Sequence, residues 1–179
     1  KELSLLHSTG KLLVFDNGLP KKLRFHDHVR ILNLIKSCQK EKNISTVRRI
    51  HADILKSNLI AKDVYIANAL ITAYGKCGSL QEALEVFEQI PLRNVVSWNA
   101  LVSGYANEGF DEKAMQCFEE MLQEDIKPDA ITFTCLLAAC NHASLLEEAY
   151  YYLKTMKEKF GITPTSKHYT CMLNLMSRS

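Results

Sequence analysis

The chain repeats itself, and this repeat restricts its possible folds more than any other feature of the sequence. The segment NALITAYGKCGSLQEALEVFEQI, which begins at Asn68, matches NALVSGYANEGFDEKAMQCFEEM, which begins at Asn99, at a constant offset of 31 residues. At a further offset of 35 residues, Leu101, Ala114 and Met121 correspond to Leu136, Ala149 and Met156. Repeats of this length are typical of stacked supersecondary units that share a continuous core.

The matches divide the chain into four complete units and one incomplete unit. Their bounds are 28–63, 64–94, 95–129, 130–165 and 166–179, so the complete units have 36, 31, 35 and 36 residues. Residues 1–27 match no unit and form an N-terminal flank of unclear structure. The chain begins at Lys1 rather than at a methionine, so we expect it to be a piece of a longer protein.

Each unit carries two helical patterns. In the unit 95–129, apolar residues recur at helical spacing, the letters NEG interrupt the pattern, and DEKAMQCFEEML resumes it. We expect Gly109 to end the first helix, Asp111 to cap the second and Pro128 to close it. The small residues Ala83, Ala114 and Ala149 fall in the middle of the second helices, where they let neighbouring helices approach closely. The sequence therefore predicts an all-α solenoid of helical hairpins.

Composition excludes several classes of function. The net charge is +2, and residues 1–27, with five Lys or Arg against three Asp or Glu, account for all of it. Binding that depends mainly on phosphate neutralisation usually needs a more basic chain. No apolar run approaches the roughly 18 residues that span a bilayer, so we expect no membrane segment.

The sequence also lacks the motifs of common enzymes and metal sites. The six cysteines are scattered singly and are expected to be reduced, buried thiols, with no metal or other cofactor bound. A glycine-rich phosphate loop, GxSxG, HExxH and the HxE followed by PCxxC of zinc deaminases do not occur in the printed sequence. We therefore expect a protein that is not an enzyme.

The residue sequences and lengths of the units resemble those of a known family. The phrases VVSWNALVSGYANEG, EKAMQCFEEM and IKPD, next to the 31-residue unit NALITAYGKCGSLQEALEVFEQIP, resemble pentatricopeptide repeat proteins of the plant type, which alternate long, short and standard units. The resemblance covers residues 28–179. It implies a right-handed superhelix that binds single-stranded RNA, one base per unit, in plant mitochondria or chloroplasts. It also implies a role as an adaptor in organellar RNA processing or editing, with other RNA-processing proteins as partners.

The resemblance assigns residues to this function. In the family, a first-turn residue of the first helix and the last residue of the unit choose the base, and the second residue of the unit packs against base faces. The implied base-reading pairs are Asn68 with Asn94, Asn99 with Asp129, and Thr134 with Thr165; the implied stacking residues are Tyr65, Val96 and Ile131. Asn99 with Asp129 resembles a uridine-preferring pair, and Asn68 with Asn94 resembles a pyrimidine-preferring pair. Leu32 has no hydrogen-bonding group, so the first unit is not expected to select a base.

The chemistry of the asparagines agrees with that assignment. An asparagine within a helix costs about half a kilocalorie per mole relative to alanine, but its amide offers both a donor and an acceptor to an unpaired base edge. The alternative is that Asn68 and Asn99 are hydrogen-bonding residues that only shape the solenoid. We expect Trp98 to lie in the core rather than to stack on a base, and His168 to be an ordinary helix residue.

Two other functions remain open from the sequence. A protein-binding scaffold is one, because tetratricopeptide repeats are also helical hairpins of about 34 residues that bind peptides in a groove. A short repeat protein that assembles into homo-oligomers is the other, because an incomplete solenoid lacks a polar terminal unit.

Overall fold

The structure is a computed structural model, and it describes residues 25–178. The expectation for the N-terminal flank therefore lies outside the described residues, except that residues 25–27 begin the first helix. The described part contains nine α-helices: α1 (Phe25–Glu41), α2 (Ile44–Lys56), α3 (Val64–Lys76), α4 (Leu80–Glu88), α5 (Val95–Asn107), α6 (Asp111–Gln123), α7 (Ala130–Ala143), α8 (Leu146–Glu158) and α9 (Ser166–Met176).

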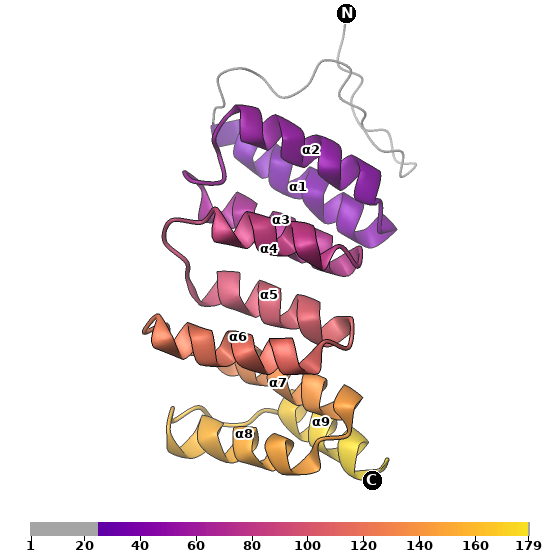
Figure 1. The fold of residues 1–179 in the computed structure, drawn as a ribbon, viewed down its shortest axis with the longest axis vertical. Helices are drawn as coiled ribbons and strands as arrows, with labels where there is room; N and C mark the ends of the chain where they lie inside the picture. Colours follow the sequence, from indigo (N-terminus) through magenta and orange to yellow (C-terminus); the bar gives the residue numbers. More distant parts are fainter. Residues whose placement is uncertain (1–24, 179) are drawn as a thin grey trace, which may run out of the picture.

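The helices form hairpins that stack along one axis (Figure 1). The first helices of successive units pack on one another, α1 on α3, α3 on α5, α5 on α7, and α7 on α9. Each second helix packs against the first helix of its own unit and the first helix of the next. This arrangement confirms the predicted all-α solenoid, because a hairpin completes its apolar core only through its neighbours.

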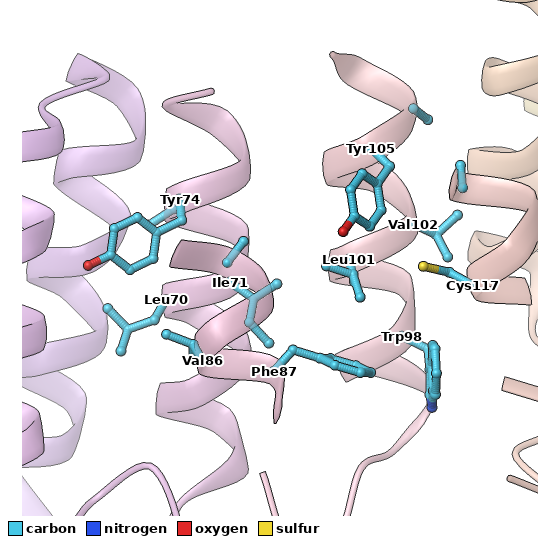
Figure 2. Packing of buried hydrophobic residues seen from close by; sticks show 14 of the residues in the cluster. Leu70, Ile71, Tyr74, Val86, Phe87, Trp98, Leu101, Val102, Tyr105 and Cys117 are labelled. Carbon is cyan, nitrogen blue, oxygen red and sulfur yellow. The ribbon is translucent and has the colours of Figure 1, made fainter. Parts of the chain in front are cut away.

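The core follows the repeated apolar positions. Ala83, Ala114 and Ala149 are all buried in their second helices, as their small size and register predict. Trp98 is only 2% exposed, and its ring meets the ring of Phe87 edge to face, with centroids 4.7 Å apart. Figure 2 shows that this pair joins α4 to α5 across the boundary between two units. The expectation that Trp98 belongs to the core is therefore confirmed.

In the turns within hairpins, the predicted end of the first helix agrees with the structure, but the predicted start of the second helix does not. Gly109 has φ of +76°, and Gly78, its counterpart in the preceding unit, has φ of +72°. Glycine enters this left-handed region without steric cost, which explains how these first helices end. The prediction that Asp111 caps α6 is wrong, because Phe110 holds the N-cap position and Asp111 is the first helical residue. Its carboxylate still favours the helix start through the helix dipole.

Two further glycines bring α3 and α5 together. A Cβ atom added to Gly75 would lie 3.2 Å from the Cα of Gly104, and one added to Gly104 would lie 3.6 Å from the Cα of Gly75. The close approach depends on Gly75 in particular, because a side chain there would press on the backbone of Gly104.

Within residues 25–178, no helix is both long and apolar enough to cross a membrane. The same region contains no group of three or more His, Cys, Asp or Glu residues arranged to hold a metal ion. The cysteines are unpaired thiols, three of them buried and three half-buried.

Candidate functional site

The two asparagine pairs predicted from the sequence meet in the structure. Asn68 and Asn99 are the fifth residues of α3 and α5, so they lie at the start of the second helical turn rather than in the first. Asn94 and Asp129 are the N-caps of α5 and α7. The amide nitrogen of Asn99 donates to Oδ1 of Asp129 at 2.9 Å, and that of Asn68 lies 3.4 Å from Oδ1 of Asn94. Stacking of the units thus joins residues that are 26 and 30 positions apart in sequence.

The caps hold the second member of each pair in place. Oδ1 of Asn94 accepts hydrogen bonds from the backbone N–H groups of Val96 and Ser97, both at 3.0 Å. Oδ1 of Asp129 accepts from Ile131 at 2.9 Å and Thr132 at 3.0 Å. Within the described residues, Nδ2 of Asn94 and Oδ2 of Asp129 have no hydrogen bond, so each cap retains one free polar group.

Both asparagines lie at the bottom of hollows on the first-helix layer. Asn68 is 5% exposed and Asn99 is 6% exposed, so most of each side chain is covered by protein. Asn68 nevertheless lines one hollow, bordered by α1, α3 and α5, and Asn99 lines the next, bordered by α3, α5 and α7. A ligand that enters these hollows can therefore reach each amide.

Apolar side chains flank the hollows. Tyr65 and Val96 both line the hollow at Asn68, while Val96 and Ile131 both line the hollow at Asn99. These three second-position residues are 73%, 52% and 60% exposed, respectively. Each hollow thus has an amide at its base and an exposed apolar side chain at each of two edges, with Val96 shared between them.

The third predicted pair is arranged differently. No hydrogen bond joins Thr134 to Thr165 within the described chain; His168 lies between them instead. Its Nδ1 accepts from the backbone N–H of Thr165 at 2.9 Å, and its Nε2 lies 2.8 Å from the carbonyl oxygen of Ala130 and 3.1 Å from Oγ1 of Thr134. Since Nδ1 is an acceptor, the neutral ring carries its hydrogen on Nε2. The expectation that His168 is an ordinary helix residue is wrong, because its buried ring joins two units.

The first unit also differs from the others. Leu32 is half-buried at the position of the reading asparagines, as its sequence indicates. Asp63, the N-cap of α3, accepts from two backbone N–H groups through Oδ1, and its Oδ2 lies 2.7 Å from Nδ1 of His28. The carboxylate of this unit is therefore already paired.

The charges at the site are few. Lys36 lines the hollow at Asn68, and Lys76 lines the hollow at Asn99. Cys135 also lines the second hollow, where burial raises the pKa of its thiol from 9.0 to about 11. This thiol therefore stays protonated at neutral pH and adds no negative charge to the site.

Sequence comparison between units missed three buried residues next to the reading positions. Ser97, Thr132 and His168 are the third residues of their units, and each is 0% or 1% exposed. Together with Asn68 and Asn99 they make up all the buried polar residues of the described chain. Their side chains differ in chemistry, so self-comparison gives no signal for them, although a serine or threonine three residues after an N-cap is a known capping pattern.

Comparison with protein families gives this architecture a name. A family model described as PPR repeat family matches residues 93–142, and one described as PPR repeat matches residues 65–95 and 131–159. The chain belongs to the pentatricopeptide repeat family. The matched residues include the whole lining of the hollow at Asn99, the α3 and α5 sides of the hollow at Asn68, and both polar pairs.

Curated relatives of this pentatricopeptide repeat chain come from Arabidopsis thaliana. The pentatricopeptide repeat-containing protein At3g53360, mitochondrial, is 39% identical over 153 residues, which are 86% of this chain and 20% of the relative. The pentatricopeptide repeat-containing protein At3g57430, chloroplastic, is 34% identical over 151 residues, which are 84% of this chain and 17% of the relative. The chain thus spans about a fifth of the length of these relatives.

A solved structure shows the same fold. The crystal structure of the pentatricopeptide repeat protein PPR10, a maize protein, in complex with an 18-nt psaJ RNA element superposes with a TM-score of 0.73. The match covers 84% of this chain and 22% of PPR10, with 23% sequence identity. At that identity the likeness establishes the shared helical architecture.

Proposed function

We propose that this pentatricopeptide repeat chain binds single-stranded RNA and that the two hollows each accept one base. The observation that carries the proposal is the repetition of one arrangement in adjacent units. Each hollow has a covered amide at its base and exposed apolar side chains at its edges. Unpaired bases have complementary features, namely hydrogen-bonding edges and flat faces.

The polar groups match a base edge at each site. At the hollow of α5, Asn99 retains one amide hydrogen after its bond to Asp129, and Oδ2 of Asp129 is a free acceptor among the described residues. A donor beside an acceptor fits a pyrimidine, whose Watson–Crick edge carries both kinds of group. Following the family resemblance, we assign a uridine preference to this unit and a general pyrimidine preference to Asn68 with Asn94.

The apolar flanks supply the stacking surface. Tyr65 and Val96 lie on either side of one base in this proposal, and Val96 and Ile131 on either side of the next. Stacking on an aromatic side chain contributes about 1 to 3 kcal/mol per base. Tyr65, the most exposed of the three flanking residues, therefore makes the first of the two sites the stronger stacking site.

Charge plays a smaller part. Lys36 and Lys76 lie beside the hollows, where they can contact phosphates, but the chain carries a net charge of only +2. Each phosphate neutralised contributes to the salt dependence of binding. We therefore expect a shallow salt dependence that reflects few phosphate contacts.

The proposed biological role is that of an organellar RNA-processing or editing adaptor. One similar relative is named chloroplastic and another mitochondrial, which supports an organellar location for this chain. The role is binding rather than catalysis, and any editing chemistry would come from outside residues 1–179. Thr134 and Thr165 are proposed as weaker contacts, because His168 already occupies the space between them.

Replacing Asn99 with alanine tests the proposal. Asn99→Ala is expected to weaken binding to a pyrimidine-rich oligonucleotide by about 1 to 3 kcal/mol and to remove the base preference at one nucleotide. Asn107→Ala is the matched control, because Asn107 lines the same hollow at the exposed end of α5. Fluorescence anisotropy at low salt gives both affinities. An Asn99→Ala variant that keeps both the affinity and the base preference of the wild type would contradict the assignment, while no binding by the wild type would favour a protein-binding scaffold.

A further inference from the structure

The two asparagines are chemically identical, yet their hydrogen bonds differ. Oδ1 of Asn99 accepts from the hydroxyl of Thr132 at 2.6 Å. Oδ1 of Asn68 is buried and has no hydrogen-bonding partner among the described residues. A buried acceptor without a partner destabilises the folded chain. The two hollows therefore offer a ligand different groups.

The orientation of Asn99 is set by its neighbours. A carboxylate only accepts, so the atom of Asn99 that faces Asp129 at 2.9 Å must be the amide nitrogen. The carbonyl oxygen then faces Thr132, whose hydroxyl donates to it. Reversing the amide would place a carbonyl oxygen against the carboxylate and leave the Thr132 hydroxyl facing N–H groups. Asn99 therefore has one fixed orientation, in which the remaining hydrogen of its amide is available to a base.

Asn68 is held less firmly. Among the described residues its side chain makes one hydrogen bond, the 3.4 Å approach of Nδ2 to Oδ1 of Asn94, which is longer than the bond of Asn99 and lacks the charge of Asp129. Ser97 corresponds to Thr132 in this unit, but its hydroxyl donates to Oδ1 of Asn94 at 3.2 Å instead of to Asn68. Asn68 therefore lacks the contact that fixes Asn99, so its amide can turn to face a base with either its N–H group or its carbonyl oxygen.

From these contacts we infer that Thr132 is a third selectivity-determining residue, which acts by fixing the amide of Asn99. The inference rests on the proposed RNA binding and extends it. A base at the α5 hollow meets a fixed donor and the Asp129 acceptor, so uracil and cytosine are distinguished there. A base at the α3 hollow meets an amide that adapts to either pyrimidine. Thr132 is a positioning residue, because its own hydroxyl is 0% exposed and does not reach the hollow.

The third residue of the fifth unit, His168, makes a similar contact with different chemistry. Thr132 is the third residue of the fourth unit, and His168 is the third residue of the fifth. Nε2 of His168 lies 3.1 Å from Oγ1 of Thr134, the reading residue of the fourth unit. The Thr134 hydroxyl donates to the carbonyl oxygen of Ala130 at 2.8 Å, so it can only accept from the ring and from a ligand. The contact between a third residue and the preceding reading residue thus recurs.

The test compares two variants that lose the same capping bond. The backbone N–H of Asp129 donates to the Thr132 hydroxyl at 3.0 Å, and that of Asn94 donates to the Ser97 hydroxyl at 3.3 Å. Thr132→Val removes the hydroxyl contacts to both the backbone and the carboxylate of Asp129 together with the Asn99 contact. Ser97→Ala removes only the equivalent contacts to Asn94. Thr132→Ser restores a hydroxyl and serves as the conservative rescue. Thr132→Ala replaces Thr132→Val if the valine variant does not fold.

Binding of the full chain to pyrimidine-only oligonucleotides provides the readout. Uridine and cytidine are exchanged at one nucleotide at a time, and the nucleotide whose preference disappears in Asn99→Ala identifies the α5 hollow. The ratio of the two Kd values there is expected to be about tenfold in the wild type, and to fall below about threefold in Thr132→Val. It is expected to return in Thr132→Ser. Ser97→Ala is expected to leave the smaller ratio at the α3 hollow unchanged.

The outcomes separate this inference from the proposed function. If Asn99→Ala removes the preference but Thr132→Val retains it, the inference is wrong and RNA binding by the hollows stands. A change in the ratio at the α3 hollow by the same factor in Ser97→Ala would also overturn it, because loss of a cap would then explain both results. If the wild type binds no oligonucleotide at low salt, both the inference and the proposed function are wrong.

Discussion

Because α3 and α5 approach closely, we expect alanine substitutions at Gly75 and Gly104 to change the free energy of unfolding in opposite directions. In Gly75→Ala the new Cβ would lie 3.2 Å from the Cα of Gly104, which belongs to a helix backbone. In Gly104→Ala the nearest atom, also at 3.2 Å, is a methyl group of Leu80. A side-chain end can move by a few tenths of an ångström, whereas a backbone atom moves only with its whole helix.

The magnitudes follow from two opposing effects. Replacing glycine with alanine within a helix stabilises it by about 1 kcal/mol. Overpacking a close contact costs about 1 to 3 kcal/mol. For Gly104→Ala, rotation of Leu80 relieves most of the contact, so we expect the free energy of unfolding to rise by about 0.5 kcal/mol. For Gly75→Ala the backbone contact remains, so we expect the free energy of unfolding to fall by about 1 kcal/mol.

Urea unfolding followed by far-ultraviolet circular dichroism measures both changes. The wild type and the two variants are compared at one temperature, and the slopes of the transitions show whether the exposed area on unfolding stays the same. The contrast between the variants is the decisive quantity, because their helix propensities are the same. A Gly75→Ala variant at least as stable as Gly104→Ala would refute the role of the backbone contact.

Other predictions concern the core, a cap and two titrating groups. Ala114→Leu should lower the free energy of unfolding by about 1 to 3 kcal/mol in urea titrations, because Ala114 is fully buried between units. Asp63→Ala should lower it by about 0.5 to 2 kcal/mol in the same assay through loss of the α3 cap. Burial raises the pKa of Cys117 from 9.0 to about 12, so its thiol binds a proton in the folded state that the unfolded state releases. Stability should therefore decline as pH rises from about 9 toward 12, and less so in Cys117→Ala. Burial lowers the pKa of His51 below 6.5, so the unfolded state binds the extra proton and stability should fall as pH drops through this range. Unfolding in buffers between pH 5 and 8, roughly the range in which histidine titrates, should show a smaller decline for His51→Gln.

Much of the fold could be predicted from the sequence, because the hydrophobic spacing recurs in every unit. The register of Ala83, Ala114 and Ala149 gave the buried face of the second helices, and Trp98 was assigned to the core correctly. The start of α6 was wrong by one residue. An acidic residue in the first turn and an N-cap have similar sequence preferences, and helix ends are the least certain part of such predictions.

The candidate site was only partly predictable for a physical reason. Recurrence pointed to Asn68 and Asn99, and the family resemblance added their partners, the last residues of the units, which the structure brings within hydrogen-bonding distance. Recurrence cannot report the third positions, because the residue type changes from unit to unit and, in the described part of the chain, only Thr132 and His168 contact the preceding reading residue. Whether Oδ1 of an asparagine has a partner depends on differences of a few tenths of an ångström, which only coordinates can show.

The contacts between helices also bear on how such chains can be rearranged. The hairpin of α5 and α6 touches only α3, α4 and α7 besides itself, so within residues 25–178 its influence ends one neighbour away on each side. A whole hairpin can in principle be transplanted to another place in an array, provided that its boundary contacts, such as the one between Phe87 and Trp98, are matched. If each unit accepts one base, as proposed, the order of nucleotides recognised would then change by transposition of intact segments, without redesign of the interior.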